Sequence, residues 1–464
     1  TIPEVREMKT NEGGATFGAI GKERSKLLAM IAVIALALCL FAAVPSGEAD
    51  AEPDYSMPDA VNGVITLDND VQLEAPYTVS EDVTEINLGN HTISRSPDAE
   101  SGEVLIVPEG VSVSIDNGTI GGTGAINGIT VNGTVELGND LIVNGYYSLR
   151  IFGGEVTTNG TVLNAGYVGV YIANADNTNS SDPSSLEMNG GSITAPTNAE
   201  AYGLSGNNQR SAGSVITING TVIEAAIGIY IPMESEVSIN NAVITALVGI
   251  EVQMGTVSIT GTEFTINSEY EPAQMPVDNG PITNGSAIII AAQNYGEYDG
   301  QYVSSPDISV NIGEGNSFDT PGYDVDVFNC KDVPSGIQSA NVTLNGDVGS
   351  VRIINDDSGT DSSDLSVTIA DSADVGELVF TGDASVSVNG IVDAITGTMI
   401  GPITIGDGAY VGIGDGFFLG DGSELVNGGS IGVSDANGLK AALVAGGVIE
   451  VNDDIETSEV KPFY

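Results

Sequence analysis

The chain of 464 residues carries 63 Asp and Glu against 12 Lys and Arg, so its formal net charge is −51. This balance excludes a nucleic-acid partner, because a protein that neutralises phosphates needs clustered Lys and Arg. The single His and the two Cys exclude zinc sites built from several imidazoles or thiolates. Apolar residues make up 41% of the chain, which is enough for a substantial core.

The N-terminal segment has the organisation of an export signal. Lys22, Arg24 and Lys26 precede an apolar run at 27–44, which is followed by Pro-Ser-Gly at 45–47 and Ala-Asp-Ala at 49–51. This order is typical of a secretory signal peptide, with cleavage expected after Ala51. The run is also close to the length that crosses a bilayer, so an uncleaved transmembrane anchor is the alternative. We therefore expect a secreted or cell-surface protein, attached to a membrane only through this segment or through a C-terminal anchor outside the sequence.

From about residue 60 onward, short β-branched runs alternate with Asn-Gly, Gly-Gly and Asn-Asn, and no helical periodicity is present. This pattern predicts an all-β fold. Residues 216–231 align without a gap on residues 237–252, 21 positions later. The shared phrase has markers at positions 159, 189, 219, 240 and 260, so the repeats are 30, 30, 21 and 20 residues apart. Repeats of this length indicate a β-solenoid, in which each coil buries its apolar side chains against its neighbours.

Side-chain alternation predicts which residues face the interior of the coil. Long polar insertions at 174–185, 270–284 and 356–364 are expected to leave the solenoid as loops. Thr217, Glu224 and Tyr230 are expected to point outward. The residues expected to point inward are Ile216, Ile218, Val222, Ile227, Ile229 and Ile231.

Four phrases, at 88–93, 117–120, 188–194 and 425–431, share the pattern Asn-Gly or Gly-Asn followed by Thr-Ile or Ser-Ile. In this respect the sequence resembles the adhesin-like surface proteins of archaea and bacteria, over roughly residues 58–432. The resemblance implies a pectin-lyase-like fold, a right-handed parallel β-helix. It implies surface location more firmly than it implies any ligand.

Three regions follow from these patterns. Residues 1–51 form an N-terminal extension with the signal peptide or transmembrane helix, and residues 52–432 form the parallel β-helix. Residues 447–455 match residues 63–71, near the start of the predicted solenoid. We therefore expect residues 433–464 to begin a second solenoid module that the sequence truncates.

We expect a surface adhesin-like or structural module that binds extracellular polysaccharide, a cell-surface glycan or a neighbouring cell. The side chains assigned to this binding are Tyr202, Tyr230 and Glu251, solely because their phase in the repeat points outward. The alternatives are a polysaccharide lyase or glycoside hydrolase and a passive envelope or stalk component. Carboxylates that converge in one groove would favour the enzyme, and evenly spread acids without an aromatic cluster would favour the passive component.

The sequence predicts no catalytic residue and no enzymatic activity. Glycoside cleavage needs two positioned carboxylates, but the 57 acids of residues 52–464 bring some pair together by chance. The ordered motifs of polygalacturonases are missing, and no Arg stands in a recognisable lyase motif. His91 is expected to be an exposed strand residue rather than a general base.

The exported part has candidate sites for a metal ion and for glycans. Oxygen ligands suited to Ca²⁺ are offered by Asp356, Asp357 and Asp361, and the alternative is that these residues belong to a solvated loop. No cofactor is predicted to be required. Eight Asn-x-Ser/Thr sequons occur, and we expect glycan first at the loop positions Asn179 and Asn284.

Overall fold

The computed structural model describes residues 56–433 and 461–462, with gaps at 123, 176–181, 199, 207–212, 269–284, 293–307, 330–338, 356–364, 415 and 421–422. The chain divides into two units, Thr1–Glu52 and Pro53–Tyr464, and every described residue belongs to the second. The predicted signal or transmembrane helix, and most of the predicted second module, lie outside the described residues. Within the described ranges there is no helix with the length and apolarity needed to cross a membrane.

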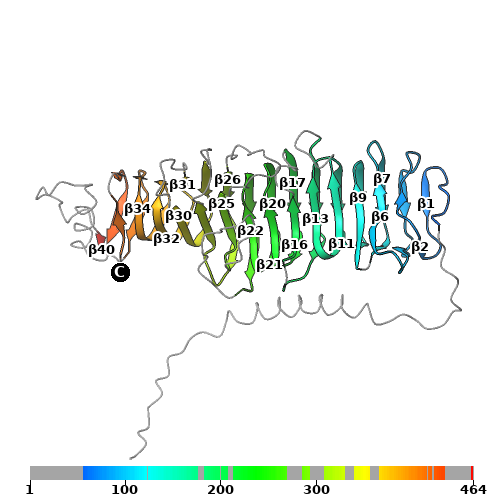
Figure 1. Ribbon diagram of the computed structural model, residues 1–464. Coiled ribbons are helices and arrows are strands. Elements are labelled where there is room, and N and C mark those ends of the chain that lie inside the picture. Colours follow the sequence, from blue (N-terminus) through cyan, green and yellow to red (C-terminus); the bar gives the residue numbers. More distant parts are fainter. Residues whose placement is uncertain are drawn as a thin grey trace, which may run out of the picture. The chain divides into compact units, whose positions relative to one another are not determined.

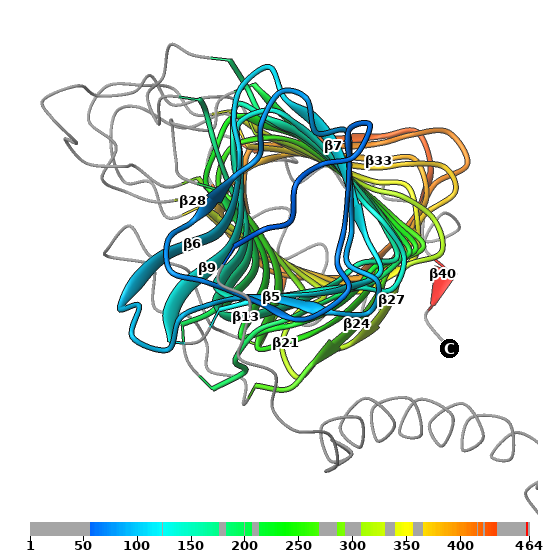
Figure 2. The ribbon, with the colours of Figure 1, turned by 90° about the vertical axis from the view of Figure 1, so that its right-hand side faces the viewer.

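The described residues form a stack of β-coils arranged in chain order, from β1 at the right of the view to β34 near the left (Figure 1). Viewed along the stack, successive coils follow closely similar outlines (Figure 2). Each full coil contributes strands to three sides, and strands on the same side of neighbouring coils pair in parallel. The all-β class and the stacked parallel strands of a β-solenoid are therefore confirmed.

The first side is a single parallel sheet of 15 strands, one from each coil. Its strands are β1 (Val64–Thr66), β4 (Glu85–Asn87), β7 (Ser112–Asp116), β10 (Thr134–Leu137), β12 (Glu155–Asn159), β14 (Ser185–Asn189), β17 (Ser214–Asn219), β20 (Ser235–Asn240), β23 (Gly255–Thr260), β26 (Ile308–Ile312), β29 (Ala340–Leu344), β31 (Leu365–Ile369), β33 (Ser385–Val388), β35 (Pro402–Ile405) and β38 (Glu424–Asn427).

The other two sides share five long strands that turn the corner between them, namely β11 (Leu141–Phe152), β13 (Val162–Ala173), β30 (Val348–Asn355), β32 (Asp374–Asp383) and β34 (Ile391–Ile400). The remaining strands of the second side are β2 (Val71–Leu73), β5 (Thr92–Arg95), β8 (Gly118–Gly121), β15 (Ser192–Thr194), β18 (Val222–Glu224), β21 (Val243–Ala246), β24 (Glu263–Ile266), β27 (Ser317–Asp319), β36 (Tyr410–Ile413) and β39 (Ser430–Val433), with β40 (Lys461–Pro462) paired to β39. Those of the third side are β3 (Tyr77–Thr78), β6 (Ser101–Val107), β9 (Ala125–Val131), β16 (Tyr202–Gly206), β19 (Ile227–Ile231), β22 (Val248–Val252), β25 (Ile288–Ala292), β28 (Val325–Asn329) and β37 (Phe418–Leu419).

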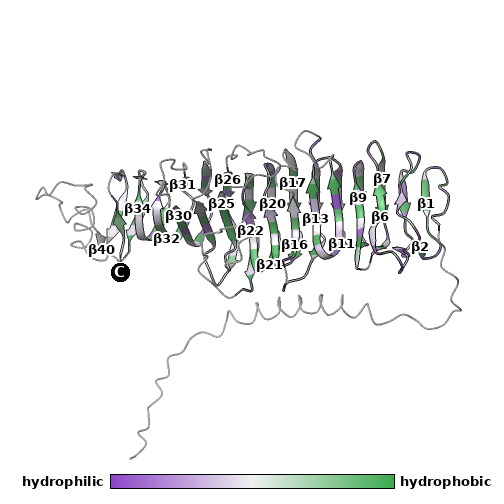
Figure 3. Ribbon diagram, viewed as in Figure 1, coloured by the Kyte–Doolittle hydropathy of each residue, from purple (hydrophilic) through white to green (hydrophobic). Residues whose placement is uncertain are grey.

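One continuous core runs through the inside of the stack, built mainly from Ile, Val and Leu. Hydrophobic residues accordingly recur along the strands of successive coils (Figure 3). Ile216, Ile218, Ile229 and Ile231 belong to this core, as alternation predicts. Val222 does not, because it is 43% exposed and its neighbour Ile223 points inward instead. The alternation of inward and outward side chains is interrupted at the corner between β17 and β18. The alternation of β17 therefore does not predict which side chains of β18 point inward.

Ile227 was also predicted to point into the coil, and this prediction is wrong for a different reason. Its side chain is buried, but it packs with Tyr202 and Tyr230 in a separate cluster rather than in the main core. The glycine that follows, Gly228, has an inward face with no room for a side chain, because a Cβ there would lie 2.7 Å from Cγ2 of Ile244. The strand therefore turns two successive positions inward, Gly228 and Ile229, and leaves Ile227 on the outer side.

The sequence repeats set the register of the sheet. Asn159, Asn189, Asn219 and Asn240 lie side by side on successive strands of the first side, and Asn240 is followed by Thr260. The side-chain amides of Asn189, Asn219 and Asn240 each donate to the side-chain oxygen of the asparagine one coil earlier, at 3.4, 3.0 and 3.1 Å. The spacing of 30, 30, 21 and 20 residues is thus the length of each coil, and the repeat prediction is confirmed.

Replacing Asn219 with Ala should destabilise the solenoid measurably. The side chain both donates to Asn189 and accepts from Asn240, so the substitution removes two half-buried hydrogen bonds. We expect a loss of about 2 kcal/mol in the free energy of unfolding, at about 1 kcal/mol for each bond. Urea unfolding followed by circular dichroism measures it, and an unchanged midpoint would show that the ladder contributes nothing.

Candidate functional site: a tyrosine face and an acidic pocket

Tyrosine side chains gather on the outside of the third side, where β11, β13, β16 and β19 lie next to one another. The register of β11 and β13 shifts between Gly145 and Tyr147, at the corner between the second and third sides. Such irregularities redirect side chains, and this one brings Tyr146 and Tyr167 together. We call the cluster the tyrosine face, which consists of Tyr146, Tyr147, Tyr167, Tyr171, Tyr202 and Tyr230.

Neighbouring rings of the tyrosine face are in contact, with centroids 5.2–5.8 Å apart. Tyr146 and Tyr167 stack at 5.2 Å with an interplanar angle of 17°, and Tyr147 meets both rings edge-on. Tyr202 continues the row from Tyr167, and Tyr230 from Tyr202. Because these contacts connect successive coils, the row of rings runs along the stack.

Exposure changes along this row. Tyr146 is 38% exposed, the next tyrosines are half-buried, and Tyr202 and Tyr230 are buried. Burial raises the pKa of Tyr147, Tyr167 and Tyr202 above the ordinary tyrosine value, and Glu200 raises it further for Tyr167 and Tyr202. These phenols therefore stay protonated at neutral pH and keep a hydroxyl that can donate a hydrogen bond.

A cationic group borders the tyrosine face. Arg150 forms an ion pair with Glu103 at 2.9 Å, and its guanidinium lies 5.5 Å from the Tyr147 ring centroid and 4.8 Å from that of Phe152. Arg95 donates to the backbone carbonyl of Glu103 at 2.6 Å. Two arginines and one glutamate thus meet here, on an otherwise strongly acidic protein.

The three side chains predicted to bind a ligand are not exposed. Tyr202 and Tyr230 are each 7% exposed and Glu251 is fully buried, although Tyr230 and Glu251 do lie outside the main core in register with each other. Tyr202 and Tyr230 pack in the tyrosine face, and Gln253 both donates to Glu251 at 2.7 Å and accepts from Tyr230 at 3.0 Å. Pointing away from the coil therefore does not make a side chain accessible on β16, β19 and β22, where every residue is buried.

Further along the third side, outside the main core, lies a buried ion pair. Asp326 and Arg352 are register partners on β28 and β30, and Arg352 donates from Nε and Nη2 to the two carboxylate oxygens at 2.8 and 2.6 Å. Ser286 donates to the same carboxylate, and the Tyr323 ring covers the guanidinium at 4.8 Å. Asp326 is fully buried, so this ion pair has a structural role and is not accessible to a ligand.

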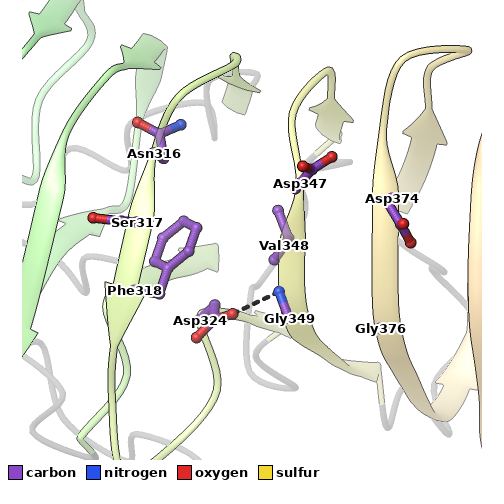
Figure 4. A pocket seen from close by; sticks show the side chains of 9 residues that line it. All are labelled: Asn316, Ser317, Phe318, Asp324, Asp347, Val348, Gly349, Asp374 and Gly376. Carbon is purple, nitrogen blue, oxygen red and sulfur yellow. Dashed lines mark hydrogen bonds between the residues drawn. The ribbon is translucent and has the colours of Figure 1, made fainter. Parts of the chain in front are cut away.

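A pocket of about 360 Å³ opens on the second side, where the ladder of paired strands is interrupted (Figure 4). There β27 pairs with β24, whereas β30 pairs with β28 and β32. Asp324 bridges the interruption by accepting hydrogen bonds from the backbone amides of Gly349 and Ser350 at 2.7 and 3.1 Å. Phe318 lines the β27 side, and Asp347 and Asp374 line the opposite side.

Carboxylates dominate the electrostatics of this pocket. Burial raises the pKa of Asp324 even though three hydrogen bonds to its carboxylate lower it. The pKa of Asp374 is raised by partial burial and then by the negative charges of Asp393 and Asp347. No cation balances these acids among the described residues that line the pocket.

Replacing Asp374 with Asn should stabilise the protein at pH 7. A carboxyl whose pKa is raised by folding stabilises the folded state when protonated, and this contribution is lost as the pH rises through the folded-state pKa. We therefore expect a higher Tm for Asp374→Asn at pH 7 and no advantage near pH 3.5, below the ordinary Asp pKa of about 3.9. Equal differences in Tm at both pH values would show that Asp374 carries no electrostatic strain.

The other predicted sites are placed less fully. His91 is half-buried on the first residue after a turn, with Nδ1 3.5 Å from Oδ1 of Asp70. The calcium ligands Asp356, Asp357 and Asp361, and the glycosylation positions Asn179 and Asn284, lie outside the described residues. Across the part of the chain that the structure describes, no group of three or more His, Cys, Asp or Glu side chains is arranged to hold a metal ion.

Sequence reasoning missed Tyr146, Tyr147, Tyr167 and Tyr171, which supply the accessible part of the tyrosine face. A signal was present, because Gly-Tyr occurs at 145–146 and again at 166–167, one coil apart. The Asn-Gly markers that define the repeat lie on the first side and do not extend to the corner that carries these tyrosines.

No protein-family model matches this chain, and neither the curated proteins nor the solved structures include a match to it. The class of the protein therefore rests on its own architecture, a β-solenoid of parallel strands that carries an aromatic cluster on one outer side.

Proposed function

We propose that this protein is an exported, adhesin-like surface module with a right-handed β-helix, and that it binds extracellular polysaccharide or a cell-surface glycan through the tyrosine face. The observation that carries the proposal is the row of contacting tyrosines with its exposed end at Tyr146. The N-terminal sequence supports export, and the repeat style supports the resemblance to adhesin-like proteins.

The chemistry of tyrosine suits a sugar ligand. Its ring offers apolar surface to the C–H groups of a sugar, and its hydroxyl exchanges hydrogen bonds with sugar hydroxyls. Arg150 and Glu103 add a charged donor and acceptor beside the rings, each with about a quarter of its side chain exposed. The accessible rings lie on β11 and β13 of two neighbouring coils, which favours a polysaccharide over a single terminal sugar, because several weak contacts add up along one chain.

The two alternatives make different demands. A passive envelope component has no need of an aromatic cluster, so the tyrosine face argues against it. A polysaccharide lyase or glycoside hydrolase needs converging carboxylates, and the pocket lined by Asp324, Asp347 and Asp374 is where such an activity would be sought. Binding requires no cofactor in this proposal, and Ca²⁺ at Asp356, Asp357 and Asp361 would act only as a structural or bridging ion.

To test this proposal, the full chain is incubated with a panel of soluble and insoluble polysaccharides, with and without Ca²⁺, and both co-sedimentation and the release of reducing ends are measured. Co-sedimentation without new reducing ends, and tighter binding of longer oligosaccharides, are the expected results. Release of new reducing ends would show instead that the protein is a polysaccharide lyase or glycoside hydrolase. Absence of both binding and release would favour the passive envelope component and contradict the proposal.

Replacing Tyr146 with Ala should weaken polysaccharide binding about tenfold. The substitution removes the most exposed ring of the tyrosine face, and one aromatic contact is worth about 1 kcal/mol, which corresponds to several-fold in affinity before any change at the stacked Tyr167. The matched control is Phe418→Ala, which removes a 49% exposed ring on β37, away from the tyrosine face. Equal losses for both variants, measured by co-sedimentation, would contradict a binding role for this face.

A further inference from the structure

Six of the eight sequons fall on described residues, and the structure divides them by what their asparagine side chains do. N-glycosylation attaches a sugar to Nδ2, so this nitrogen must be accessible and must not be held in a hydrogen bond that the fold requires. The asparagines concerned are Asn90, Asn117, Asn132, Asn159, Asn219 and Asn341.

The ladder asparagines cannot meet this requirement. Nδ2 of Asn219 donates to Asn189 at 3.0 Å, and Nδ2 of Asn159 donates to Glu136 at 2.9 Å. A glycan on either nitrogen would have to fit beside the ladder side chains of the neighbouring coils, whose strands are only about 4.8 Å apart. Their Asn-Gly-Thr sequences are accounted for by the ladder alone.

Three other sequons are constrained by their surroundings. Asn117 and Asn132 are half-buried at coil corners. Asn341 is exposed, but it lies within β29 in the middle of the 15-stranded sheet, and its side-chain oxygen accepts a hydrogen bond from Ser366 at 2.7 Å.

Asn90 differs from all of these. It is exposed at the tip of the turn between β4 and β5, where Gly89 and Asn90 adopt φ values of 58° and 68°. The backbone of the turn is fixed by the Asn90 amide, which donates to the carbonyl of Asn117 at 2.6 Å. Within the described part of the chain, by contrast, no hydrogen bond involves the Asn90 side chain. The Asn90 side chain is thus exposed on a turn whose backbone is hydrogen-bonded to the next coil.

We propose that Asn90, in Asn90-His91-Thr92, carries an N-linked glycan in the exported protein. The donor is a polyprenyl-diphosphate-linked oligosaccharide. Nδ2 forms the bond to C1 of the first sugar, the bond from C1 to the diphosphate oxygen breaks, the polyprenyl diphosphate leaves with the electron pair, and Nδ2 loses one proton to a base. The inference depends on export but not on polysaccharide binding by the tyrosine face.

The test is peptide mapping by mass spectrometry of the full chain purified from its native source, together with the variants Thr92→Val and Thr119→Val. Thr92→Val removes the Asn90 sequon and leaves Asn90 in place, and Thr119→Val does the same to the Asn117 sequon one coil later. We expect a glycan mass on the Asn90 peptide, its loss in Thr92→Val only, and unmodified peptides for Asn159 and Asn219. An unmodified Asn90 peptide in protein shown to be outside the cytoplasm would overturn the inference, as would modification of Asn219 instead.

Discussion

Gly169→Ala should be among the most destabilising single substitutions in this solenoid, with an expected loss of about 3 kcal/mol in the free energy of unfolding. Gly169 lies on β13, and a Cβ there would overlap Cγ2 of Ile193 and lie 2.5 Å from the carbonyl oxygen of Gly203 on the next coil. Both neighbours are fixed, one in the core and one in the backbone of the paired strand. Gly203, Gly228 and Gly249 repeat this close approach in successive coils, so relief at one coil displaces the next.

The matched control is Gly166→Ala on the same strand. A Cβ at Gly166 would meet only ordinary contacts, the nearest being Cδ2 of Tyr146 at 3.5 Å, and the residue is exposed. Its substitution should change stability by less than about 0.5 kcal/mol. Urea unfolding of both variants measures the difference, and comparable midpoints for Gly169→Ala and Gly166→Ala would contradict the close coil-to-coil packing described above.

Arg352→Met should cost about 3–5 kcal/mol of folding free energy, because it leaves the fully buried Asp326 carboxylate without its bidentate partner. The length of the side chain is kept, so the loss reflects the missing charge and hydrogen bonds rather than a cavity. Thermal unfolding followed by circular dichroism provides the measurement.

The double variant Asp326→Leu with Arg352→Met separates the two contributions. Removing both charges eliminates the unpaired carboxylate, so the double variant should be more stable than Arg352→Met alone. A double variant as unstable as the sum of both single variants would mean that the two side chains act independently, contrary to the geometry of their two hydrogen bonds.

The fold could be predicted from the sequence because each sequence repeat corresponds to one coil of the solenoid. Asparagines that recur every 20–30 residues form a ladder only if each coil returns the chain to the same place, so Asn159, Asn189, Asn219 and Asn240 report the register directly. Alternation also predicted correctly that Ile216, Ile218, Ile229 and Ile231 lie in the core. It failed at Val222, which follows a corner between strands, and at Ile227, where Gly228 and Ile229 both turn inward within β19.

The candidate site could be predicted only in part. Outward phase was inferred correctly for Tyr230 and Glu251, but exposure depends on what covers the sheet, which no repeat pattern encodes. The tyrosine face and the acidic pocket both arise at irregularities, a register shift at Gly145/Tyr147 and an interrupted ladder beside β27. Such irregularities depart from the repeat and are therefore invisible to an analysis based on it.

Chemical footprinting of the tyrosines tests the central claim most directly, since the chain has 15 Tyr and no Trp. The full chain is nitrated with tetranitromethane in the presence and absence of the polysaccharide that co-sediments with it, and each tyrosine is quantified by peptide mapping. We predict that bound polysaccharide protects Tyr146 and Tyr167, while Tyr410 on β36 reacts equally in both samples. Polysaccharide that binds and yet leaves Tyr146 fully reactive would contradict the assignment of the tyrosine face as the binding surface.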